Sequence, residues 1–198
     1  MTIEVDGDRA RVDFAGTSPE SPRGINVVLN YTEAYATFAL KALLAPDVPN
    51  NEGSFRSVAV TAPEGSILNC RRPAPVAARH ILGHFIPGLI FRALADAVPD
   101  LIMAEGSANL WNTQFHGFRP DGSRFNLLFF NAGGTGARSG SDGLSSTAFP
   151  SGMSGTPVEI IESRSPLVVL EKSLRPDSGG AGQHRGGLGH RLVIAGLR

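Results

Sequence analysis

Two glycine-rich tracts hold the residues best suited to chemistry in this chain. Residues 177–189 read DSGGAGQHRGGLG, with six glycines among one aspartate, one histidine and one arginine. Residues 131–143 read NAGGTGARSGSDG, with five glycines, one arginine and one aspartate. Flexible linkers seldom interleave glycine with such side chains. Tight turns, or a backbone that approaches a ligand closely, would explain the pattern.

The glycines suggest a site for a negatively charged group. Backbone N–H groups that point the same way can form a concave site for a phosphate, a carboxylate or an oxyanion. Arg138 and Arg185 would add charge and forked hydrogen bonds. We therefore take as substrate-binding candidates Arg138, Arg185, Gly133, Gly134, Gly179 and Gly180. Neither tract has the spacing of a Walker loop or a dinucleotide fingerprint. The alternative is that the glycines form tight corners that pack against each other.

Two acids and one imidazole lie in the same tracts. If the tracts converge in space, Asp142, Asp177 and His184 could share one cleft and perform general acid–base catalysis. We take these three residues as the catalytic candidates. The alternative for Asp142 and Asp177 is that their side-chain oxygens cap turns, as aspartate before glycine or serine usually does.

Other reactive side chains give weaker signals. His80 and His84 are four residues apart in a helical stretch, which is a metal-ligand spacing. The glutamate of a zincin motif is missing, however, and the sequence identifies no third ligand. We therefore assign no metal ligand to this chain. The single cysteine, Cys70, is interpreted as a partly buried thiol rather than a nucleophile.

Strands are indicated by two Asp-Gly pairs and by several short apolar runs. Asp-Gly between alternating apolar residues predicts β-hairpins in residues 2–14 and 117–130. Further strand candidates are residues 55–60, 66–68, 101–104, 109–115, 157–161 and 167–170, with a last one near Leu192.

Two stretches have helical periodicity. Residues 31–44 place their apolar side chains on one helical face, and Pro46 ends the pattern. Residues 76–98 predict a long helical stretch that Pro87 and Gly88 kink or divide. The sequence therefore predicts an α+β fold with mixed, mainly antiparallel sheets, two substantial helices and glycine-rich loops. We expect one domain over residues 1–198.

Composition narrows the class of protein. The 18 basic residues balance the 18 acidic ones, which argues against a nucleic-acid or anionic-membrane surface. No apolar run approaches the roughly 18 residues of a membrane span. A single cysteine cannot form an internal disulfide, so a reducing cytoplasm is the simplest setting. We expect a cytoplasmic protein that acts on a small molecule.

Several segments, taken in order, resemble the hydantoinase B family. They are DFAGTSP at residues 13–19, NNEGSFR at 50–56, PEGS at 63–66 and the two glycine-rich tracts. This family includes 5-oxoprolinase C-terminal regions, N-methylhydantoinase large components and acetone-carboxylase-type subunits. The resemblance runs from about residue 12 to residue 189. Family members are considerably longer, so we expect the middle-to-C-terminal part of such a protein: a fragment, a split subunit or a degenerate relative.

The resemblance implies an activity and a partner. It implies ATP-dependent hydrolysis of a cyclic amide, such as a hydantoin, 5-oxoproline or a related lactam. ATP and Mg²⁺ would bind a hydantoinase-A-like subunit with an actin-like ATPase fold, in a hetero-oligomer. No cofactor would bind this chain, and any divalent metal would belong to the family's region before DFAGTSP. From the matching segments the site candidates Asp142, Asp177, Arg138 and Arg185 are carried over, and His184 is added from its local chemistry.

Two other functions remain open on the same residues. One is a subunit of an ATP-dependent ketone carboxylase. The other is a non-catalytic assembly module that keeps the fold and the subunit interface without the active site.

Overall fold

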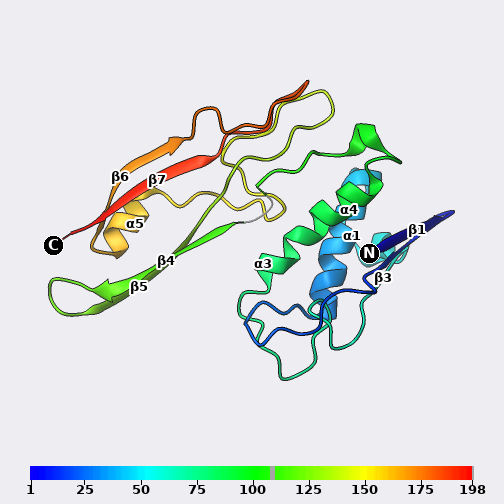
Figure 1. Cartoon of the computed structure of the whole chain (residues 1–198), viewed down its shortest axis with the longest axis horizontal. Helices are drawn as coiled ribbons and strands as arrows, with labels where there is room; N and C mark the ends of the chain where they lie inside the picture. The colour runs from blue at the N-terminus through cyan, green and yellow to red at the C-terminus, as the bar shows by residue number, and fades with distance from the viewer. Residues whose placement is uncertain (108–109, 198) are drawn as a thin grey trace. The chain divides into compact units, whose positions relative to one another are not determined.

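The structure, a computed structural model, describes residues 1–107 and 110–197 (Figure 1). The chain forms two compact units, Met1–Ile102 and Met103–Arg198, which are described one at a time. The first unit combines helices with a three-stranded sheet, and the described residues of the second combine helix α5 with two two-stranded sheets; most strand pairs are antiparallel. The predicted α+β fold class is therefore confirmed. The interpretation of residues 1–198 as a single domain stays a prediction.

The sheet of the first unit begins with the expected hairpin. Strands β1 (Thr2–Asp6) and β2 (Arg9–Asp13) pair antiparallel, with Asp6 opposite Arg9. Gly7 lies in the turn between them with φ of 58°, a conformation that glycine adopts without strain. Strand β3 (Val58–Thr61) then adds to β2 in parallel.

Strand β3 begins later than the apolar run suggests. Residues 52–55 form the short helix α2 (Glu52–Phe55) instead. Asn51 caps this helix, because its side-chain oxygen accepts a hydrogen bond of 2.9 Å from the Ser54 N–H. Residues 66–68 and 101–104 were expected as strands and form none; Pro99–Leu101 is a 3-10 turn, η1.

Helices cover this sheet. Helix α1 (Leu29–Leu44) follows the predicted periodicity and packs on β3 and on helix α4 (Phe85–Leu94). The second helical stretch is divided, as expected, but at His84, between α3 (His80–Gly83) and α4. Pro87 lies in the first turn of α4, where a backbone N–H has no helical partner to lose, so proline is tolerated there.

The second unit contains two antiparallel pairs. Strands β4 (Trp111–Phe118) and β5 (Arg124–Asn131) form the second predicted hairpin. Strands β6 (Leu167–Leu174) and β7 (His190–Gly196) confirm the last two strand predictions. In the candidate strand at 109–115, residues 111–115 belong to β4, and Asn109 lies outside the described residues.

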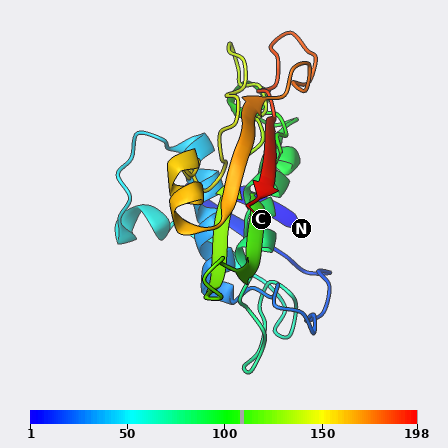
Figure 2. The same cartoon turned by 90° about the vertical axis from the view of Figure 1, so that its left-hand side faces the viewer.

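One predicted strand of this unit is wrong. Residues 157–161 belong mostly to helix α5 (Val158–Arg164), which lies beside β6 (Figure 2). Glu159 stands in the first turn and Arg164 in the last, both favourable placements for a helix. The apolar run was too short to separate strand from helix by periodicity. Ile161 of α5 completes a core with Leu127, Phe129 and Leu167.

No helix within the described part of the chain is long and apolar enough to cross a membrane.

His190, on β7, is buried in an unusual way. Neither of its ring nitrogens has a hydrogen-bond partner among the described residues, and both are inaccessible to solvent. A small cavity of about 30 Å³ adjoins it, lined also by Asn131, Ser154 and Lys172. Burial lowers the pKa of His190 below its usual 6.5, and the nearby charge of Lys172 lowers it further.

We expect His190 to make the chain less stable in mild acid. Below about pH 6.5 the unfolded chain takes up a proton that the folded chain resists, so the free energy of unfolding falls as the pH falls. Urea unfolding from about pH 7 to about pH 5 should therefore show a smaller loss in His190→Gln than in the parent chain. His116→Gln, which alters an exposed histidine, is the control. Equal losses in all three proteins would contradict the expectation.

Candidate functional site

The two glycine-rich tracts converge in the second unit. Residues 131–143 follow β5, and residues 177–189 join β6 to β7. The Gly143 N–H donates to the Arg185 carbonyl at 2.7 Å, and the Gly187 N–H donates to the Thr135 carbonyl at 2.9 Å. The sequence suggested a shared site only if the two tracts converge in space, and the structure shows that they do.

The convergence is direct backbone packing. A Cβ atom on Gly134 would overlap the backbone of Gly187, and one on Gly187 would overlap the backbone of Leu144. Gly143 is equally close to the backbone of Thr135. A third segment joins them, because the Ser107 N–H donates to the Gly134 carbonyl at 2.9 Å. Any larger residue at these glycines would push the segments apart.

This packing bears on the four glycines taken as substrate-binding candidates. Gly133 lies against the Ser107 side chain, Gly134 against Gly187, and Gly179 against the Gly186 carbonyl. Close packing is a sufficient reason for glycine at these three positions. Gly180 differs, because open space surrounds the position of its missing Cβ. Substrate binding by the four glycines stays a prediction.

An acid and an imidazole meet where the tracts join. Oδ1 of Asp142 accepts a hydrogen bond of 2.8 Å from the Arg185 N–H and lies 3.7 Å from Nδ1 of His184. Both side chains are accessible, with 64% of Asp142 and 34% of His184 exposed. The carboxylate thus lies beside one ring nitrogen of the imidazole. Acid–base catalysis by Asp142 and His184 stays a prediction.

The structure does not bring all candidates into this contact. The side chains of Arg138, Asp177 and Arg185 are exposed, and they form no hydrogen bond or ion pair with the described residues. Arg138 stands in a turn closed by a 3.0 Å bond from its N–H to the Ser141 carbonyl. Asp177 has a φ of 57°, which is uncommon for a residue with a side chain. Their catalytic or substrate-binding roles stay predictions.

Hydroxyl groups that sequence reasoning missed bind the backbone of these loops, and one of them, that of Ser145, joins the two loops. Thr135 Oγ1 accepts from the Leu144 N–H at 2.8 Å, and Ser145 Oγ accepts from the Leu188 N–H at 3.0 Å. Ser178 Oγ accepts from the Gly189 N–H at 2.8 Å. Serine and threonine interleaved with glycine were the available signal, because short hydroxyl side chains often bind nearby backbone.

The weaker candidates lie elsewhere. The rings of His80 and His84 are 5.9 Å apart, and His84 is buried beside Tyr35. In the described portion of the chain, no three His, Cys, Asp or Glu residues are grouped to hold a metal ion. Burial raises the pKa of the Cys70 thiol, and the charge of Glu20 adds to the effect, which disfavours the reactive thiolate.

Comparison with known proteins gives one family over the whole sequence. A model of the family described as hydantoinase B/oxoprolinase matches residues 1–198.

Curated relatives agree over nearly all of the chain. An uncharacterized protein of Methanocaldococcus jannaschii is 40% identical over 194 residues, covering 98% of this chain and 34% of its own length. The B component of a putative D-/L-hydantoinase from a Pseudomonas species is 32% identical, covering 96% of this chain and 33% of its own length. This chain spans about a third of the length of these two relatives and of a caprolactamase beta subunit, and 14–15% of the length of the matching 5-oxoprolinases.

Solved structures share the fold. The crystal structure of an ATP-dependent caprolactamase from Pseudomonas jessenii is 28% identical, with a TM-score of 0.85, covering 99% of this chain and 35% of that chain. Nucleotide-free acetone carboxylase has a TM-score of 0.80 at 22% identity, which shows the fold alone.

We expect Asp142 to stabilise the tract junction through its oxygen rather than its charge. Asp142→Ala removes the acceptor of the Arg185 N–H and should lower the free energy of unfolding by about 1 kcal/mol, since the bond is partly exposed. Asp142→Asn keeps an Oδ1 acceptor and should lose less than about half of that. Urea denaturation followed by circular dichroism measures both. An asparagine variant as unstable as the alanine variant would show that the charge holds the junction.

Proposed function

The chain belongs to the hydantoinase B/oxoprolinase family, and we propose that it is a component of an ATP-dependent cyclic-amide hydrolase. Relatives named for a substrate are a hydantoinase, 5-oxoprolinases and a caprolactamase. Hydantoin, 5-oxoproline and caprolactam are all cyclic amides. The substrate class proposed for this chain is therefore a hydantoin, 5-oxoproline or a related lactam.

The observation that carries the catalytic proposal is the contact of Asp142 with His184. Hydrolysis joins the oxygen of water to the carbonyl carbon, breaks the C–N bond and moves one proton to the leaving nitrogen. His184 would accept the proton from water and return it to that nitrogen. Asp142 would stabilise the imidazolium in between. Both residues are accessible at the junction of the two tracts.

Positively charged side chains within the tracts are proposed to bind the substrate. Arg138 and Arg185 are exposed, with guanidinium groups suited to a carboxylate or to a developing oxyanion. Gly180 has open space beside it, where a ligand can approach the backbone. Asp177 is proposed as a second acid or base, because its carboxylate is exposed on the same tract as His184.

The proposal also includes a partner. Two relatives are named as subunits, one of a hydantoinase and one of a caprolactamase. We place ATP and Mg²⁺ on a hydantoinase-A-like subunit with an actin-like fold, which would activate the carbonyl oxygen. We place any divalent metal in a part of the longer relatives that this chain does not span. The complex would be a cytoplasmic hetero-oligomer.

A second candidate function has its own support. Gly133, Gly134 and Gly179 are explained by packing alone, without a ligand. A non-catalytic assembly module, which keeps the fold and a subunit interface, would need the same glycines. The two functions differ in what happens when the Asp142–His184 pair is altered.

We expect the pair to be required for turnover. In the complex of this chain with an actin-like ATPase subunit, Asp142→Asn and His184→Gln should each lower kcat by about 10²-fold, because proton transfer is impaired. Chromatography of the opened ring, with ATP and each of 5-oxoproline, hydantoin and caprolactam, measures the rate. His116→Gln is the matched control on an exposed histidine of β4.

Unchanged kcat in both variants would exclude the proposed acid–base role. A chain that still assembles with the ATPase, in a complex that turns over none of the three substrates, would favour the assembly module.

A further inference from the structure

The sheet of the first unit leaves the outer edge of β3 unpaired among the described residues. In its parallel ladder with β2, the Ala10 N–H donates to the Ser57 carbonyl and the Phe14 N–H donates to the Thr61 carbonyl, each at 2.8 Å. Backbone groups alternate in direction along a strand, so Ser57, Ala59 and Thr61 face β2. The N–H and C=O groups of Val58 and Val60 therefore face away from β2.

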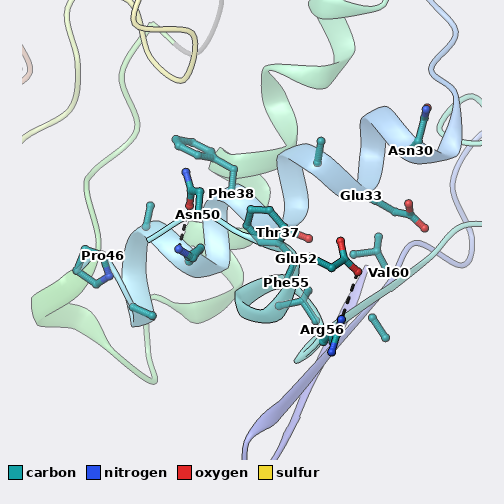
Figure 3. A pocket seen from close by; sticks show the side chains of 16 residues that line it. Asn30, Glu33, Thr37, Phe38, Pro46, Asn50, Glu52, Phe55, Arg56 and Val60 are labelled. Carbon is teal, nitrogen blue, oxygen red and sulfur yellow. Dashed lines mark hydrogen bonds and ion pairs between the residues drawn. The ribbon is translucent and has the colours of Figure 1, made fainter. Parts of the chain in front are cut away.

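A groove of about 960 Å³ runs along this edge (Figure 3). Three consecutive residues of β3, Val58, Ala59 and Val60, line it. A groove over one face of a strand would meet only alternate residues, so this groove includes the edge itself. Its other wall is α1, α2 contributes Glu52 and Phe55, and Arg56 follows α2 directly.

The wall formed by α1 is an exposed apolar stripe. Ala34, Phe38 and Ala42 follow one another at intervals of one helical turn, and all three are exposed. In Figure 3, Phe38 and Thr37 lie along α1 beside the groove. A strand that paired with Val58 and Val60 would cover this stripe. It would thereby bury apolar surface that now faces water.

The two edges of the sheet differ in their protection. Proteins guard exposed edges with charged residues, proline or bulges, because open backbone groups invite pairing with another chain. The outer strand β1 carries the exposed acids Glu4 and Asp6. Strand β3 reads VAVT and has neither charge nor proline. The composition of β3 is that of a strand inside a sheet.

One acidic side chain of the groove has no partner among the described residues. Glu33 lines the groove and forms no hydrogen bond or ion pair with the described residues. Lys41 is already held by the Asn50 side chain at 2.9 Å and by the Val48 carbonyl. Glu52 has a single distant partner, Arg56, at 4.0 Å. The carboxylate of Glu33 is thus available to a positive side chain.

We propose that this groove binds an extended β-strand from a polypeptide outside residues 1–198. The strand would pair with Val58 and Val60, direct alternate apolar side chains toward Phe38 and place a basic side chain near Glu33. Three curated relatives carry about two thirds of their length outside the stretch that this chain matches, and that length is the source we infer. The interaction does not depend on the proposed function.

A peptide and two matched variants test the proposal. The probe is a short fluorescent peptide of alternating valine and threonine with one lysine, and the measurement is fluorescence anisotropy with the 198-residue chain. Phe38→Glu should weaken binding by about tenfold or more, because it places a charge in the apolar wall. Leu44→Glu should change binding by less than about twofold. Both residues are exposed on α1, but only Phe38 lines the groove.

Two further measurements test the charge preference and the pairing of the strand edge. Exchanging the lysine of the peptide for glutamate should weaken binding by about tenfold, and Glu33→Gln should abolish that preference. Hydrogen exchange at the Val58 and Val60 amides should be fast in the free chain and slow by about tenfold with the peptide bound.

Three results would overturn the proposal. They are no saturable binding up to about 1 mM peptide, equal losses in Phe38→Glu and Leu44→Glu, or slow exchange at Val58 and Val60 in the free chain. A dimer in analytical ultracentrifugation that Phe38→Glu dissociates would also overturn it, because the occupant would then be a second copy.

Discussion

Contact of backbone with backbone, without side chains between, is the constraint on which the second unit depends. The tract that follows β5 and the tract that joins β6 to β7 approach so closely at Gly134, Gly143 and Gly187 that a Cβ has no room. Glycine loses more conformational entropy on folding than any other residue. That cost is offset by hydrogen bonds between the tracts and by the hydroxyls that clamp them.

The candidate site follows from this contact. Asp142 and Arg185 are 43 residues apart in sequence, yet the junction brings a carboxylate oxygen of one to the N–H of the other. The same oxygen lies beside His184. One atom therefore takes part both in holding the loops together and in the environment of the imidazole. In contrast, Arg138 and Asp177 stand on the same tracts without joining that contact.

Local features of the sequence predicted local features of the fold. The Asp-Gly pairs specified both hairpins, because few residues other than glycine adopt a positive φ at such turns. The periodicity of α1 was sufficient because the helix is long and buries one face. The same reasoning misassigned residues 157–161, since a short apolar run fits a strand or one face of a short helix such as α5.

The site was predicted less completely, for a physical reason. Glycine content indicated that the two tracts were unusual, but not which glycines would touch. The clamps by Thr135, Ser145 and Ser178 depend on which backbone groups the fold brings near, and hydroxyl residues are too common to reveal that alone. The sequence therefore predicted the contact of Asp142 with His184 only on the condition that the two tracts meet.

A junction built without side chains also limits how such a protein can evolve. No substitution of Gly134, Gly143 or Gly187 is conservative, because any other side chain adds atoms where the neighbouring backbone leaves no room. Side chains at the rim, such as Arg138 and His184, can be exchanged without adding atoms to that packed layer. Apart from Oδ1 of Asp142, which takes part in both, the packing of these loops and their candidate chemistry rest on different atoms.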